Sequence, residues 1–483
     1  MNTKSILGIT LSLLVILTCL ECRRSLPPPV QKSEDIIVIQ NVNLAPMTDE
    51  KIVKNQDVLV KGNRIIEIGP SKTIAVPENS KRIDGTGAYL MPGLADMHMH
   101  TRDDWNKWLS DWPVSPLYLY LANGVTTIRC FGPHGDTVGY VLRWREKINS
   151  GQLIGPTIYT SGPIIYGPVN NPQKLVQEQI ASGFDFIKLY SFLSREEFHE
   201  AMITAKQAGI YTAGHIPFQV GLEGVLSEGM NEIAHIEELA WEFVYFDRNK
   251  GLKGREWMTY VIMSAYKLFK PYFGLNREEL DDRFGDQGRP VAGKVHSANI
   301  PVCTTLFLDD VIVEKLFASK KFLSKPENKY LPHTYLAAFR QGREKHQMQF
   351  RGGEDFAPFK RTVDRILLKY LKEAKVLLVL GTDAGTGRMG LVPGFSIHDE
   401  LRLLTENGFT PYEAIKTGTV NAAIVVEEMN GNGDFGTIEI GKRADLILVN
   451  DNPLEDVANI KNILGVMASG RWYDKTMLQK FID

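Results

Sequence analysis

Residues 89–100 read YLMPGLADMHMH, an apolar run that ends in a pair of histidines. The run contains the first of eight short β-type segments, and a segment with helical periodicity follows each of them. The eight segments are residues 94–100, 125–130, 156–162, 184–190, 210–216, 231–239, 300–307 and 375–383. A repeated βα unit predicts a parallel sheet, and eight such units close into a (β/α)8 barrel. We therefore expect an α/β protein with a distorted TIM barrel over residues 91–434.

The segments on either side of the barrel have a different pattern, in which apolar residues alternate around turns such as Lys61-Gly62-Asn63. This pattern predicts hairpins. Each flank is thin for an independent core. Residues 36–90 and 435–483 are therefore expected to join in one small β-sandwich domain.

Two of the βα units are much longer than the others, with insertions at about 240–295 and 310–370. Both insertions are rich in aromatic and charged residues. Active sites of such barrels lie on the loops that follow the strands, so the insertions are candidates for a lid or wall over the site. The alternative is that they form peripheral helices or contacts in an oligomer.

The composition is that of a globular protein, since 43% of the 483 residues are apolar. This apolar fraction excludes a disordered or collagen-like chain. Because 55 Lys and Arg balance 57 Asp and Glu, leaving a formal charge of -2, no nucleic-acid partner is expected. Four cysteines are too few for a disulfide framework.

The amino-terminal residues have the pattern of an export signal. Lys4 precedes an apolar run of about 15 residues (6–20), and Arg23 and a string of prolines follow. The run is shorter than the roughly 20 residues of a spanning helix and matches the centre of a signal peptide. Residues 1–30 therefore predict an exported protein, periplasmic or extracellular, with an uncleaved anchor as the alternative. Cys19 loosely matches a lipoprotein cleavage site, which would give a lipid anchor to the membrane.

Side chains suited to metal binding stand at the ends of the predicted strands. His98 and His100 are two residues apart on the first strand, so both imidazoles point to one face. His215 ends the fifth strand, His235 lies in the sixth, and Asp383 ends the eighth. A buried carboxylate needs a partner, and His and carboxylate ligands together suit Zn²⁺. The pattern predicts a metal centre at the mouth of the barrel.

Lys188 ends the fourth strand, between the apolar residues Ile187 and Leu189. A lysine at this position could pair with a carboxylate or form a Schiff base. The surrounding set of ligand-type side chains suggests a third role, in the metal centre itself.

The sequence resembles the amidohydrolase superfamily over about residues 36–475. The segments that carry the resemblance are LMPGLADMHMH (90–100), GVTTIR (124–129), GPTIYTSG (155–162), FDFIKLY (184–190), TAGHIP (212–217), IAHIEEL (233–239), GTDAG (381–385), FSIHDELRLLTENGFTPYEAIKTGTVNAA (395–423) and GTIEIGKRADLILV (436–449).

The resemblance implies a site with two divalent metal ions, expected to be Zn²⁺, in which Lys188 has reacted with CO₂ to give a bridging carbamate. It assigns His98, His100 and Asp383 to the more buried ion, and His215 and His235 to the more exposed one. A hydroxide that bridges the two ions would attack the substrate carbonyl. Asp383 is the expected catalytic residue, because it would take the proton of this hydroxide and pass it to the leaving nitrogen.

Three further residues are candidates for substrate binding. Tyr190 shares a strand face with Lys188 and could donate to the developing oxyanion, or it could be a packed aromatic residue. Arg129 and His134 follow the second strand and could hold a substrate carboxylate, with an internal ion pair as the alternative for Arg129. His398 is interpreted as structural. His199, His296, His333 and His346 lie in helical or inserted segments, and no role is assigned to them.

These observations predict a metal-dependent hydrolase that acts on carbon–nitrogen bonds, outside the cytoplasm. The expected substrate is a small amide or peptide, cleaved in a dipeptidase, prolidase-like or N-acyl amino acid hydrolase reaction. The alternatives are cyclic amide hydrolysis of the imidazolonepropionase type, or a barrel that binds ligands without catalysis. A homo-oligomer is also expected.

Overall fold

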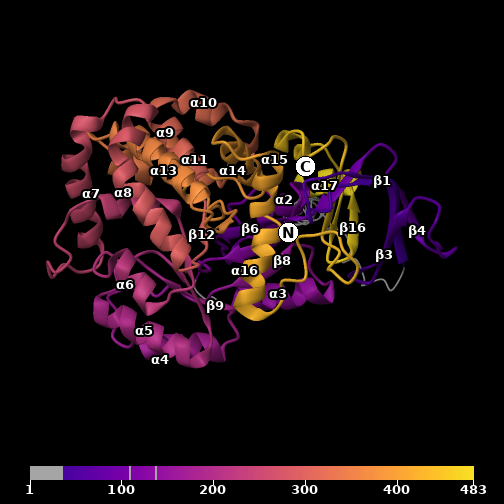
Figure 1. Cartoon of the computed structure of the whole chain (residues 1–483), viewed down its shortest axis with the longest axis horizontal. Coiled ribbons are helices and arrows are strands. Elements are labelled where there is room, and N and C mark those ends of the chain that lie inside the picture. Colours follow the sequence, from indigo (N-terminus) through magenta and orange to yellow (C-terminus); the bar gives the residue numbers. More distant parts are fainter. Residues whose placement is uncertain (1–35, 108–109, 136–138) are drawn as a thin grey trace, which may run out of the picture.

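The computed structural model describes residues 36–107, 110–135 and 139–483 (Figure 1). The predicted export segment, residues 1–30 with Cys19, lies outside the described residues. Within the described part of the chain, no helix combines the length and the apolar character that crossing a membrane requires.

Eight parallel strands form the centre of the molecule, side by side in their sequence order. They are β6 (Leu94–Met99), β7 (Val125–Cys130), β8 (Thr157–Thr160), β9 (Phe186–Leu189), β10 (Tyr211–Gly214), β11 (Glu232–Ile233), β12 (Val302–Cys303) and β13 (Leu378–Val379). β6 to β8 pair in one run and β9 to β13 in a second. Parallel bridges join the runs at both junctions, Ser161 with Phe186 and Met99 with Ala384. The predicted distorted (β/α)8 barrel is confirmed.

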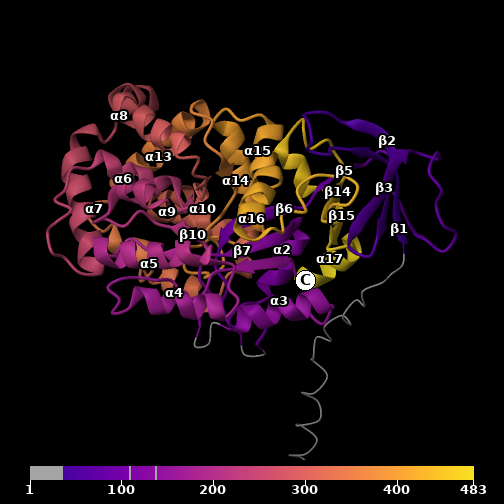
Figure 2. The same cartoon turned by 60° about the horizontal axis from the view of Figure 1, so that its bottom comes forward.

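Helices follow the strands and surround them (Figures 1 and 2). Those after β6 to β10 are α2 (Pro116–Ala122), α3 (Tyr140–Ser150), α4 (Pro172–Ala181), α5 (Arg195–Ala208) and α6 (Gly221–Glu228). Those after β13 are α14 (Phe395–Glu406), α15 (Pro411–Thr417) and α16 (Val420–Asn430). Local sequence sets their ends, as in α5, where Ser194 and Glu197 form a capping box and Gly209 ends the helix in a left-handed conformation.

The two insertions are helical. The first contains η1 (Ile236–Phe243), α7 (Arg255–Phe269), η2 (Lys270–Tyr272) and α8 (Arg277–Ser297). The second contains α9 (Phe307–Phe317), α10 (Ser319–Ser324), η3 (Pro326–Tyr330), α11 (His333–Arg340), α12 (Lys345–Gln349) and α13 (Phe356–Glu373). In both views α7 and α8 lie at the end of the molecule away from β1 and β3 (Figures 1 and 2).

The flanking segments form a second, smaller β-domain. Its strands are β1 (Ile36–Leu44), β2 (Val53–Lys61), β3 (Arg64–Pro70), β4 (Lys81–Asp84), β5 (Tyr89–Pro92), β14 (Leu446–Val449), β15 (Ile463–Ala468) and β16 (Arg471–Asp474). The order is β16-β15-β14-β5-β1-β2-β3, with β4 beside β1. The antiparallel pairing of β5 with β14 joins the two flanks, and η4 (Val457–Lys461) and α17 (Lys475–Ile482) complete this end of the chain.

Candidate active site

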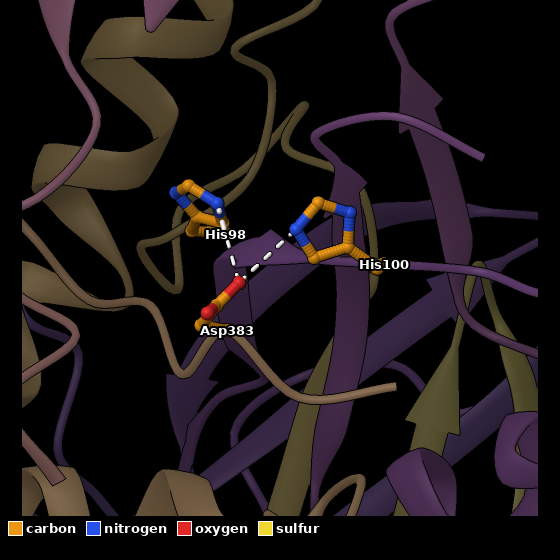
Figure 3. Close-up of side chains that lie close together, drawn as sticks. All are labelled: His98, His100 and Asp383. Atoms are coloured by element: carbon orange, nitrogen blue, oxygen red, sulfur yellow. Dashed lines mark ion pairs between the residues drawn. The ribbon is translucent and has the colours of Figure 1, made fainter. Parts of the chain in front are cut away.

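The first group of predicted ligands meets where β6 ends beside the segment that follows β13 (Figure 3). One carboxylate oxygen of Asp383 lies 3.0 Å from Nε2 of His100 and 3.6 Å from Nε2 of His98. The ligand atoms of these residues all lie within 4.8 Å of one another. Alternation along β6 turns both imidazoles to the same side of the strand. The three side chains form a compact set that could hold one metal ion.

Backbone carbonyls orient the two imidazoles. Nδ1 of His98 donates to the carbonyl oxygen of Ala234 at 3.1 Å, and Nδ1 of His100 donates to that of Gly132 at 3.0 Å. With Nδ1 used in this way, Nε2 is the atom of each ring that would face a metal ion. Asp383 has a left-handed backbone with φ 59°, a conformation that aspartate tolerates better than most residues. The strain is held in place by its backbone N–H, which donates to the carbonyl oxygen of His98 at 2.7 Å.

The second group stands beside the first. The ring of His235 lies 4.3 Å from that of His98 and 4.8 Å from that of His215, between centroids. Nδ1 of His235 is hydrogen-bonded to Thr305 at 2.8 Å, and Nδ1 of His215 is hydrogen-bonded to the carboxylate of Glu238. These partners fix the two rings in the way that outer-shell groups orient metal-binding histidines.

Lys188 is buried at the end of β9, and its ammonium lies 4.6 Å from the centre of the Phe131 ring. Among the described residues, Nζ of Lys188 and Nε2 of His98 are buried atoms without a hydrogen-bond partner. Buried polar atoms are rarely left unpaired, so these two atoms fit a site completed by a bound group. A carbamate on Nζ and a metal ion on Nε2 are groups that these atoms could accept.

Burial also sets the protonation of this site. Loss of solvation lowers the pKa of Lys188 to about 8, although Asp383 and Glu238 act in the opposite direction. Loss of solvation likewise lowers the pKa of His235 to about 3, with the neighbouring His215 adding to the effect. The imidazole of His235 is therefore neutral at pH 7, which is the form that binds metal ions.

A cavity of about 1250 Å³ opens over these side chains and is lined by His100, His215, His235, Lys188 and Asp383. Residues of α7, α9, α12 and α13 also line it, so both insertions form walls of the cavity. Of the two interpretations of the insertions, the structure supports a wall over the site.

Arg129 is not a substrate-binding residue, and that prediction is wrong. Its side chain is 0% exposed, lies outside the cavity lining and pairs through both terminal nitrogens with Glu232, which is also 0% exposed. Its Nε donates to the carbonyl oxygen of Met97 at 2.9 Å. The internal ion pair weighed as the alternative is the arrangement that the structure has.

His134 and Tyr190 line the cavity. The ring of His134 lies 5.1 Å from that of His100, and burial lowers the pKa of His134 to about 4. The ring of Tyr190 lies 4.3 Å from that of His215 and stacks on Tyr166 at 4.1 Å. Both side chains can reach a molecule bound beside the ligand set.

Sequence analysis missed several residues of the site. Glu238, three positions after His235, orients His215 and also accepts a hydrogen bond from the backbone of Ile216 at 3.0 Å. A carboxylate so close to a predicted ligand was the available signal. His346, to which no role is assigned from sequence, is buried and lines the cavity from the second insertion. His398 is structural as expected, since its Nε2 donates to the carbonyl oxygen of Asn123 at 3.1 Å.

A second cluster of carboxylates, Glu237, Asp309 and Asp364, also has the spacing of a metal site. Lys360 fills it, with Nζ lying 2.6, 3.0 and 2.6 Å from the three side chains in that order. The lysine thus supplies the positive charge, and the cluster is an internal salt-bridge network that joins η1 to α9 and α13.

Comparison with known proteins extends the picture. The ochratoxinase of Aspergillus niger is 24% identical over 443 residues, covering 85% of this chain and 80% of the relative. The crystal structure of A. niger ochratoxinase matches with a TM-score of 0.56 at 19% identity, over 91% of this chain and 96% of that one. A Xaa-Pro dipeptidase structure with bound methionine matches with a TM-score of 0.58 at 20% identity, over 91% and 100% of the two chains.

The (β/α)8 fold brings together a set of His, Asp and Lys side chains of the kind that could hold divalent metal ions. A model of the Amidohydrolase family matches residues 355–473, the stretch that contains Asp383 and ends in β16. Over this stretch the chain is similar to the Amidohydrolase family.

Proposed function

We propose that the protein is an exported, metal-dependent amidohydrolase that cleaves the amide bond of a dipeptide or an N-acyl amino acid. The observation that carries the proposal is a set of six ligand-type side chains: His100, Lys188, His215, His235 and Asp383 line one cavity, and His98 lies beside them. The dipeptidase and ochratoxinase similarities support the reaction class. The extracytoplasmic location, a lipid anchor on Cys19 and a homo-oligomer are proposed from the sequence.

In this proposal His98, His100 and Asp383 would hold one metal ion, His215 and His235 would hold a second, and Lys188 would complete the set as a carbamate. Bound there, the ions would supply a water of pKa about 7 and polarise the substrate carbonyl. The neutral amine of Lys188 is the form that reacts with CO₂, and its lowered pKa raises the share of that form at neutral pH.

Asp383 is the proposed proton carrier. Burial alone would raise the pKa of its carboxyl group, but the hydrogen bond and charge of His100 more than compensate and lower the pKa to about 2. The carboxylate is therefore ionised at pH 7 and can accept a proton from the attacking water. The same oxygen would then hand that proton to the leaving nitrogen, which completes the amine product.

Tyr190 and His134 are proposed to orient the substrate. Burial raises the pKa of Tyr190 well above its usual value, so its phenol stays protonated and can donate to the carbonyl oxygen as negative charge develops. The neutral imidazole of His134 can donate to a carboxylate of the substrate.

Metal analysis of Lys188→Ala tests the proposal. Purified wild-type protein reconstituted with Zn²⁺ should hold about two ions per chain and hydrolyse members of a dipeptide and N-acyl amino acid panel. Lys188→Ala should lose activity and metal, while Lys206→Ala, which changes an exposed lysine of α5, should keep both. Fewer than about one ion per chain in the wild type, or unchanged activity in Lys188→Ala, would rule the mechanism out.

A further inference from the structure

Helix α7 of the first insertion is apolar on two sides. One side packs into the core and consists of Trp257, Val261, Ala265 and Phe269. The other lines the cavity and includes Met258, Ile262, Met263 and Tyr266, at the spacings expected for neighbours on one helix face. A helix at the edge of a domain usually turns a polar side away from the core. The apolar character of the cavity-facing side therefore requires an explanation.

This side of α7 is only partly covered by the rest of the described chain. Met258, Ile262 and Tyr266 are only partly buried, and Met263 is 50% exposed. Methionine side chains are flexible and adapt to apolar ligands of different shapes. The surface is thus available to a bound molecule.

The second insertion continues the apolar surface across the cavity. Leu308 and Ile312 of α9 line it, as do Phe350 and Phe356 near α13. The metal-ligand residues His235 and Asp383 belong to the same cavity. Its volume of about 1250 Å³ exceeds the roughly 300–1,000 Å³ that is usual for small-molecule sites. A small dipeptide would leave the apolar walls in contact with water.

The cavity also has positively charged side chains that lie on other elements than the apolar residues of α7 and α9. Lys345 and Arg388 line it, are exposed, and form no ion pair with any residue that the structure describes. The cavity thus offers apolar walls together with cationic groups, which matches an amphiphilic anion.

We infer that the α7 face, together with Leu308, Ile312 and Phe350, is a subsite for a large apolar group of the substrate, such as a medium alkyl chain or an aromatic ring system. This inference rests on the proposed function and narrows its substrate class. The favoured substrate is an N-acyl amino acid with a bulky apolar acyl group, and not a small dipeptide.

A series of N-acyl phenylalanines with acetyl, butanoyl, hexanoyl and octanoyl groups tests the subsite. Because each buried methylene contributes about 0.8 kcal/mol, kcat/KM of the zinc-loaded enzyme should rise about fourfold per methylene until the chain fills the walls. Ile262→Ser and Met263→Ser should flatten this dependence, because each removes apolar contacts of the subsite. Leu268→Ser is the matched control, since Leu268 is an exposed apolar residue of α7 (41%) that does not line the cavity.

Calorimetry with octanoate and butanoate gives a readout that does not need turnover. Octanoate should bind the wild type and Leu268→Ser tighter than butanoate by roughly the same fourfold per methylene, and this preference should be lost in Ile262→Ser. Octanoate preference without hydrolysis of any amide would contradict the proposed function and support the subsite. Equal cleavage of acetyl and octanoyl substrates, with no octanoate preference, would overturn the subsite and leave the proposed function intact.

Discussion

The buried ion pair of Arg129 and Glu232 is predicted to stabilise the barrel and to have no part in substrate binding. Substituting Arg129→Met removes the guanidinium from a fully buried position and keeps a side chain of similar length. Glu232 would then retain only the Tyr211 hydroxyl, which donates to it at 3.2 Å, and the carbonyl oxygen of Met97 would lose its donor. The variant therefore leaves a buried carboxylate without its counter-charge.

The expected magnitude follows from the burial of both partners. Breaking a buried pair by removing one partner costs about 3–5 kcal/mol, because a charge remains in a medium of low polarity. Replacing both partners, as in Arg129→Met combined with Glu232→Leu, removes that charge as well. Such a double replacement is often neutral or better, so it should recover most of the loss.

Urea unfolding of the metal-free wild type, the two single variants and the double variant measures these free energies. Arg129→Met should lose about 3–5 kcal/mol, and the double variant should be more stable than that single variant by about 2 kcal/mol or more. Arg129→Met should not change the KM for a carboxylate-bearing substrate selectively, since Arg129 does not line the cavity. Unchanged stability together with a raised KM would refute this interpretation and restore a substrate-binding role.

Three further predictions follow from the site. Glu238→Gln should weaken metal binding by about 10–100-fold, because it disturbs the group that orients His215, and metal titration should show this while the fold is kept; unchanged affinity would contradict it. Tyr190→Phe should lower kcat by about 10²–10³-fold with metal content unchanged, as expected for loss of an oxyanion donor; an unchanged kcat would show a packing role. Burial would raise the pKa of Glu344, but its hydrogen bond with His346 more than offsets this and lowers the pKa to about 2. The stability that Glu344 contributes is thus fully present above its usual pKa near 4.5 and is lost as the pH falls towards 2, so the stability difference between wild type and Glu344→Gln should shrink over that range; a constant difference would contradict it.

The barrel could be predicted because each of its strands has a recognisable local sequence pattern, a short apolar run followed by a segment with helical periodicity. The pattern is present even where the hydrogen-bonded part of the strand is as short as Val302–Cys303 or Leu378–Val379. The ends of the strands also indicate which residues lie close together, because parallel strands have their carboxyl ends on the same side of the barrel. His98, His100 and Asp383 could therefore be expected together although 283 residues separate the last two.

The role of Arg129 could not be predicted in the same way. Arg129 is the second-last residue of β7. The sequence pattern at this position is the same whether the side chain faces the cavity or is buried inside the barrel beneath it. The Arg129 side chain is held in its buried position by hydrogen bonds to the carbonyl oxygen of Met97 and to Glu232, which lies 103 positions further along the chain. Neither contact can be recognised from the local sequence around Arg129. The same holds for α7, whose second apolar side has meaning only once the cavity is known.

The Phe131 ring lies between the buried pair of Arg129 and Glu232 and the predicted metal ligands, and it influences the properties of Lys188. The guanidinium of Arg129 lies 4.7 Å from the centre of the Phe131 ring, and the imidazole of His98 stacks on that ring at 4.0 Å. Lys188 meets the same ring at 4.6 Å. The apolar ring keeps water away from the lysine, and loss of solvation lowers the pKa of Lys188 to about 8, so a larger share of its amine is neutral at pH 7 than for an ordinary lysine. The Phe131 ring thus favours the proposed reaction of Lys188 with CO₂, and Arg129 of the buried ion pair contacts the same ring.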